Sequence, residues 1–165
     1  MGIKVPWSVL PDYRCFGCSP HNPAGLGLTF TPNPEGVQAR FRLDRGFESY
    51  PGVVHGGLVG VICDETMGNL IVLDRRRTAF TVSLRTRFVA PLLVDRDYVC
   101  VARLHDGPEA PLIHASAEVV DAEGDMCATA TATYQPFTLQ DVRDQLTLGD
   151  DEVALLTQAL TANGA

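Results

Sequence analysis

Two adjacent acidic residues, Asp64 and Glu65, lie inside the most apolar stretch of the sequence, residues 53–73. Read as a helix from about Gly56, this stretch carries apolar side chains on nearly every side, which is typical of a helix in the centre of a core. A buried carboxylate costs free energy unless something pairs with it or uses it. We therefore predict that Asp64 is a general base or a nucleophile. Glu65, about 100° away around the helix, stays open as the alternative acid.

Small residues surround Asp64 on the predicted helix. Gly57, Gly60 and Gly68 lie at helical spacing from it, so the four residues share one face. Each glycine inside a helix costs roughly 1 kcal/mol relative to alanine, which indicates that another backbone or a ligand approaches this face. We expect a substrate to lie along these glycines, with Met67 as a candidate to line its pocket.

The start of the same helix offers a second chemical feature. Gly56 and Gly57 leave the first backbone N–H groups uncovered, and such groups bind anions or an oxyanion. His55 either caps this helix start or takes part in the chemistry. From Gly56 to Asp64 is roughly 12 Å along a helix axis, too far for both to reach one carbonyl. Two antiparallel copies about a two-fold axis solve this problem, so we predict a composite site at a homodimer interface.

A Cys-x-x-Cys sequence, Cys15-Phe16-Gly17-Cys18, stands near the start of the chain with His21 close behind it. Such a pair can begin a zinc site, but a closed site needs four ligands. The next cysteine, Cys63, falls inside the predicted core helix, and no thioredoxin-like pattern surrounds the pair. We interpret this segment as a tight loop with two half-buried thiols, and we expect no metal and no cofactor.

The composition of the 165-residue chain, with 45% hydrophobic and 20% charged residues, suits one soluble globular domain. A net charge of −7 argues against binding to nucleic acid or to anionic membranes. Two clusters of arginines could nevertheless hold the phosphates of a ligand, and the first cluster could instead stabilise the end of the central helix: Arg75, Arg76 and Arg77, and Arg85 and Arg87.

The sequence also suggests where the protein works. Its five cysteines are scattered and do not form a secreted disulfide framework, and no signal-peptide pattern is seen. Asp, Glu, Asn and Gly residues interrupt the central helix too often for a bilayer span. We therefore expect a cytoplasmic protein.

The remaining elements follow from periodicity and turn residues. Apolar alternation and turn signals predict a hairpin, the central helix, four more strands and one or two short helices that begin at Thr138 or Asp150. The expected strands are residues 26–31, 37–43, 78–88, 98–105, 112–120 and 126–136. This order predicts an α+β fold in which an antiparallel sheet of about six strands wraps around one long helix. We divide the chain into an N-terminal loop segment (1–25), a central domain (26–137) and C-terminal surface helices (138–165).

Across residues 14–136, the sequence resembles the hotdog-fold acyl-CoA thioesterases of the PaaI-like (phenylacetate-pathway) family. Several short motifs in order carry the resemblance: Cys15-Phe16-Gly17-Cys18 with Asn22-Pro23, His55-Gly56-Gly57, Asp64-Glu65-Thr66-Met67-Gly68, and Phe88-Val89-Ala90-Pro91. The resemblance implies a hotdog fold, a homodimer or a dimer of dimers, and hydrolysis of an acyl thioester of coenzyme A or of an acyl carrier protein. It implies no metal, and coenzyme A would enter only as part of the substrate.

The resemblance also assigns roles to residues. It implies that Asp64 is the base or nucleophile, that Gly56 supplies the backbone oxyanion donor, and that His55 positions the carbonyl or the loop. It implies that Thr81 orients the attacking water, and we expect Ser83 on the same face of its strand as a substrate contact. Many relatives carry Asn or Gln a few residues before the His, whereas Phe-Glu-Ser-Tyr stands at positions 47–50 here.

Two other functions stay open at this point. A non-catalytic hotdog module would bind acyl-CoA or a carrier-bound acyl group without releasing a free thiol. A hotdog dehydratase would use a histidine near the acid, and His55 is a candidate. The sequence does not indicate which acyl group is bound.

Overall fold

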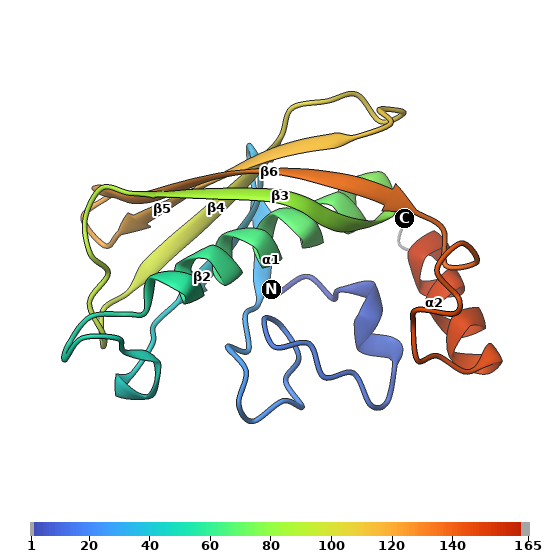
Figure 1. Ribbon diagram of the computed structural model, residues 1–165, viewed down its shortest axis with the longest axis horizontal. Helices are drawn as coiled ribbons and strands as arrows, with labels where there is room; N and C mark the ends of the chain where they lie inside the picture. The colour runs from blue at the N-terminus through green and yellow to red at the C-terminus, as the bar shows by residue number, and fades with distance from the viewer. Residues whose placement is uncertain (1, 163–165) are drawn as a thin grey trace.

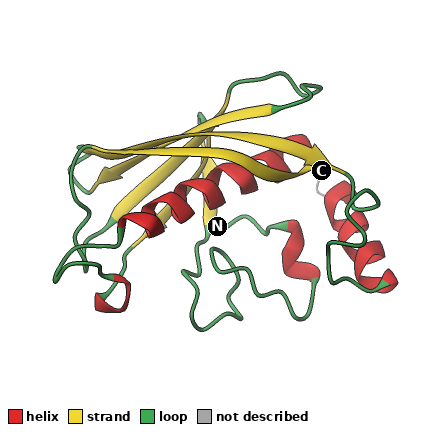
Figure 2. Ribbon diagram, viewed as in Figure 1, coloured by secondary structure: helices red, strands yellow, loops and turns green. Residues whose placement is uncertain are grey.

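The structure is a computed structural model that describes residues 2–162. Residue 1 of the predicted loop segment and residues 163–165 of the predicted C-terminal segment lie outside this range. Six strands form one antiparallel sheet in the order β1-β2-β4-β5-β6-β3 (Figures 1 and 2). Their bounds are β1 Phe30–Asn33, β2 Gly36–Phe41, β3 Thr78–Phe88, β4 Tyr98–Leu104, β5 Ile113–Asp121 and β6 Met126–Phe137. The predicted six-stranded antiparallel sheet is confirmed.

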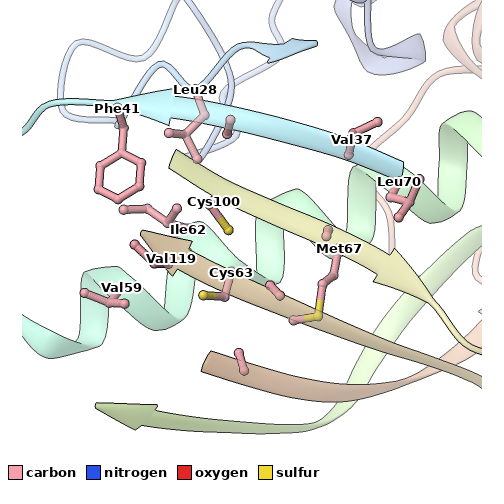
Figure 3. Packing of buried hydrophobic residues seen from close by; sticks show 14 of the residues in the cluster. Leu28, Val37, Phe41, Val59, Ile62, Cys63, Met67, Leu70, Cys100 and Val119 are labelled. Carbon is pink, nitrogen blue, oxygen red and sulfur yellow. The ribbon is translucent and has the colours of Figure 1, made fainter. Parts of the chain in front are cut away.

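The long helix α1 (Gly56–Arg75) packs along one face of the sheet, as predicted (Figure 1). Figure 3 shows Val59, Cys63 and Met67 of this helix among the buried residues between helix and sheet. Opposite them, alternate residues of β6 are small and buried, which lets the helix lie close to the sheet: Ala128, Ala130 and Ala132. This packing buries the side of α1 that faces the sheet, so the opposite side remains for other contacts.

The N-terminal segment covers the side of α1 that faces away from the sheet (Figure 1). Val5, Cys18 and Leu28 join the main hydrophobic core, and Cys15 contacts Glu65 of α1. By length and hydropathy alone α1 could cross a membrane, since its mean hydropathy reaches 1.4. Its position between sheet and N-terminal segment is instead that of a core helix.

The observed bounds of several elements differ from the predicted ones by one or two residues, and those of the first hairpin strand differ most. The first hairpin strand begins at Phe30 instead of residue 26, because residues 26–28 bond to the Cys15–Cys18 loop through the Leu26 and Leu28 N–H groups. Only one C-terminal helix forms within the described residues, α2 (Asp150–Ala162). Thr138 and Asp141 bond to each other as at a helix start, but the chain there forms turns.

A bulge in β3 overturns the expectation that Thr81 and Ser83 share a face. Thr81 pairs with Tyr134, but Ser83 pairs with Thr133, so the register shifts at the intervening Val82. Successive strand residues point to opposite faces, and one extra residue reverses that phase. Thr81 therefore faces α1, and Ser83 lies on the outer face of the sheet.

Candidate active site

Asp64 receives two hydrogen bonds from strands that lie beside α1. Its Oδ1 accepts from the Thr81 hydroxyl at 2.9 Å and from the Tyr134 hydroxyl at 2.8 Å. Thr81 is on the edge strand β3 and Tyr134 is its direct neighbour on β6. Among residues 2–162, no donor bonds to Asp64 Oδ2. One carboxylate oxygen is thus held in place and the other remains for water or a substrate.

The two donors lie in different environments. The Tyr134 side chain is 1% exposed, whereas Thr81 is exposed on the sheet edge. Burial, followed by the negative charge of Asp64, raises the pKa of Tyr134 far above its usual value. Tyr134 therefore stays protonated and keeps its hydrogen for Asp64. The sequence does not point to Tyr134 as the hydrogen-bond donor to Asp64, although its side chain faces α1, as do those of the alternate residues Ala128, Ala130 and Ala132.

Glu65 has different partners and is held by the N-terminal segment. Its Oε1 accepts hydrogen bonds from Asn69 Nδ2 at 2.9 Å and from the Cys15 thiol at 3.3 Å. Burial raises the pKa of Glu65 to about 7. Gly17 packs so closely on this carboxylate that a Cβ there would lie 2.5 Å from Glu65 Cδ. The N-terminal segment thus covers Glu65.

A pocket of about 330 Å³ opens beside Asp64. Its lining joins α1, β3, β6 and the N-terminal segment, and includes Trp7, Tyr13, Cys15, Gly68 and Thr81. Asp64 and Glu65 both border it, so both predicted acids meet one pocket. Met67 is fully buried between α1 and the sheet and does not line this pocket.

The helix start is capped by His55. Its Nδ1 accepts a hydrogen bond from the Gly57 N–H at 3.0 Å, so this predicted oxyanion donor is already used within the chain. The Leu58 N–H bonds to the His55 carbonyl. Across the part of the chain that is described, the Gly56 N–H has no such acceptor. Gly56 is therefore the donor at this helix start that remains for a ligand.

The predicted strip of glycines divides into two parts. A Cβ on Gly60 would lie 3.6 Å from Thr86 Oγ1, and one on Gly57 would lie 3.1 Å from His55 Nδ1, so β3 covers the first and the His55 ring covers the second. A Cβ on Gly68 would meet no atom of the described residues within 4 Å, and Gly68 borders the pocket beside Asp64. Within one chain, the open part of the strip is at Gly68.

The arginines also divide into two groups. Arg75 donates to the Asp106 carbonyl and Arg77 to the Ala110 carbonyl, so both fasten the loop between β4 and β5. Arg76 adopts a left-handed conformation at the end of α1, with φ 56°. Arg85 and Arg87 lie exposed on β3 and form no ion pair within residues 2–162. Arg85 and Arg87 are therefore more available than Arg75 and Arg77 to bind an anion.

No family model and no curated protein matches the sequence. Solved structures do match the fold. A thioesterase superfamily protein is 17% identical with a TM-score of 0.65, over 73% of this chain and 62% of its own. AziG from S. sahachiroi is 28% identical with a TM-score of 0.61, and the match covers 69% of this chain and 94% of AziG. A Streptococcus mutans protein bound to acetyl-CoA is 19% identical with a TM-score of 0.63, and the match covers 78% of this chain and 95% of that protein.

The first of these matches spans under two thirds of the other protein's length, so it carries the fold and not the activity of the whole protein. The sheet order, the central helix and these similarities agree with one another. The chain therefore has the hotdog fold of the thioesterase-superfamily structures, as the resemblance of its motifs implied.

Proposed function

We propose that the protein hydrolyses acyl thioesters of coenzyme A or of an acyl carrier protein, with Asp64 as the catalytic carboxylate. The observation that supports this most is the asymmetric setting of Asp64. Thr81 and Tyr134 hold Oδ1 at the edge of the pocket, and Oδ2 has no donor within residues 2–162. Glu65, by contrast, is engaged by Cys15 and Asn69.

In the proposed reaction, Asp64 takes a proton from water as the water oxygen attacks the thioester carbonyl. The Gly56 N–H stabilises the resulting oxyanion. The tetrahedral intermediate then expels the thiolate, which takes the proton from Asp64, so that a carboxylic acid and a free thiol leave. Direct attack by Asp64 would instead form an anhydride that water hydrolyses, and the same residues serve that route.

A homodimer is part of this proposal, since Gly56 and Asp64 lie eight residues apart on one helix. Strand β3 is an edge strand of 11 residues, and its outer edge is unpaired within the described chain. It exposes large apolar side chains along its length and just beyond it: Phe80, Val82, Leu84, Phe88 and Val89. Long apolar edges promote pairing with another chain. Two copies joined along β3 would bring each helix start toward the other chain's Asp64.

Coenzyme A is the donor that we propose first. The Streptococcus mutans structure contains acetyl-CoA, and a Streptococcus pneumoniae hypothetical thioesterase of the same fold was crystallised with coenzyme A. On this chain, Arg85 and Arg87 are exposed cations on the outer face of the edge strand β3, and guanidinium groups are suited to the phosphates of such a donor.

The test is a thiol-release assay on the purified protein with acyl-CoAs of graded chain length and with aryl-CoAs, followed by the matching acyl carrier proteins. We expect at least one thioester to be hydrolysed with a kcat/KM of about 10⁴ M⁻¹s⁻¹ or more. Saturable binding without thiol release across the panel would refute hydrolysis and would favour the non-catalytic binding module.

A further inference from the structure

Three potential metal ligands meet beside the pocket. The Cys15 and Cys18 sulfurs and a carboxylate oxygen of Glu65 all lie within 4.8 Å of one another. Cys18 is buried, and the other two are partly buried. Around tetrahedral zinc with bonds of about 2.3 Å, ligand atoms lie about 3.8 Å apart. The three groups thus need to move by no more than about 1 Å to share one ion.

The loop that presents the two cysteines is fixed in shape. Its backbone is tied to the following segment by the Leu26 N–H to Phe16 carbonyl bond (2.7 Å) and the Leu28 N–H to Gly17 carbonyl bond (2.9 Å). Gly17 lies against the Glu65 side chain, where any Cβ would collide with it. The loop therefore brings its thiols to the carboxylate only because position 17 has no side chain.

Two further polar groups surround the three ligands. The Tyr13 hydroxyl lies 3.0 Å from the Cys18 sulfur, and Asn69 Nδ2 donates to Glu65 Oε1. Asn69 is 6% exposed, and its Oδ1 is buried without a hydrogen-bond partner among the described residues. Metal ligands are commonly oriented by such outer hydrogen bonds. An unpartnered buried oxygen, on a side chain that also bonds to the Glu65 carboxylate, is what an ion or its water would satisfy.

We propose that Cys15, Cys18 and Glu65 bind a zinc ion that fastens the N-terminal segment to α1, with the fourth position taken by water or by Asn69 Oδ1. Two sulfur ligands and one oxygen favour zinc over magnesium or calcium. In the sequence, the next cysteine after Cys18 is Cys63, which falls inside the core helix, and this is why no metal is expected there. The third ligand of the proposed site is instead Glu65, two residues after Cys63. This inference does not depend on thioester hydrolysis.

The test is metal analysis of the full chain, purified under reducing conditions without chelator from cells grown with added zinc. We expect about one zinc per chain, and we expect cobalt(II) to give a sulfur-to-metal charge-transfer band. The double variant Cys15→Ser/Cys18→Ser should lose both signals. Glu65→Gln should lower zinc affinity at least tenfold, and Asn69→Ala by roughly 10- to 100-fold, as for an outer-shell partner. Cys127→Ser, a cysteine on β6 outside the cluster, is the matched control.

A second measurement covers the case in which a cysteine variant fails to fold. With wild-type protein, a chelator should increase the alkylation of Cys15 and Cys18, mapped by mass spectrometry, and zinc should restore their protection. The proposal is overturned if wild-type protein neither retains zinc nor takes it up at micromolar concentration. It is equally overturned if the double variant binds zinc as well as the wild type does, or if Cys15 and Cys18 form a disulfide in the reduced preparation.

Discussion

The two hydroxyls that hold Asp64 should contribute unequally to stability, and this can be measured with Tyr134→Phe and Thr81→Val. Both changes remove one donor to the same oxygen and keep the shape of the side chain. Tyr134 is 1% exposed, whereas Thr81 lies on the open edge strand. A hydrogen bond to a charged group contributes about 1.5–3 kcal/mol, and water replaces an exposed donor at little cost. We therefore expect Tyr134→Phe to lower the free energy of unfolding by about 1.5–3 kcal/mol, and Thr81→Val by about 1 kcal/mol or less.

Urea denaturation followed by circular dichroism measures both values, and the Asp64→Asn background supplies the control. With a neutral acceptor, the Tyr134 bond loses its charge assistance, so Tyr134→Phe should cost less there. The difference between the two backgrounds gives a coupling free energy, which we expect at about 0.5–3 kcal/mol. If Thr81→Val destabilised the protein as much as Tyr134→Phe, or if the coupling were zero, the arrangement described for Asp64 would be wrong.

Three further predictions test the surroundings of the site. Val82 lies at the bulge of β3 and is 58% exposed, so Val82→Lys should shift the protein from dimer to monomer in sedimentation experiments. Val9→Lys, at another exposed site, should leave the dimer intact. A wild-type protein that sediments as a monomer would refute the dimer. Arg85→Ala/Arg87→Ala should raise KM for acyl-CoA about tenfold but leave KM unchanged for the phosphate-free N-acetylcysteamine thioester; equal effects would contradict phosphate binding. Gly17→Ala places a methyl group against the Glu65 carboxylate, so it should lower Tm by several degrees. An unchanged Tm would contradict the close packing of Gly17 on Glu65.

The elements of the fold were predictable because their patterns are local. The apolar stretch from Gly56 and the two-residue alternation of β3 to β6 depend on neighbours in the sequence, and the helix and strands follow them closely. The bulge at Val82 was not predictable, since the alternation of residue types continues through it while the pairing with β6 shifts. That one residue decides that Thr81, and not Ser83, reaches Asp64.

The site was only partly predictable because its contacts span large sequence distances. Asp64 is predicted as a site residue from its apolar surroundings, but its buried hydrogen-bond donor Tyr134 is 70 residues away. Likewise, Cys15 reaches Glu65 across 50 residues, and nothing in either local sequence names the other. The role of His55 was left open between cap and catalyst, and the structure shows it as the cap of α1.

The most direct test of the account compares Asp64→Asn with Glu65→Gln on the best thioester of the panel, in protein shown to be folded by circular dichroism. Both changes are nearly isosteric and remove one carboxylate each from neighbouring positions. We predict that Asp64→Asn lowers kcat by about 10²–10⁴-fold, the scale of losing a general base, and that Glu65→Gln retains most of the turnover. Undiminished turnover by Asp64→Asn would contradict the assignment of Asp64 as the catalytic carboxylate.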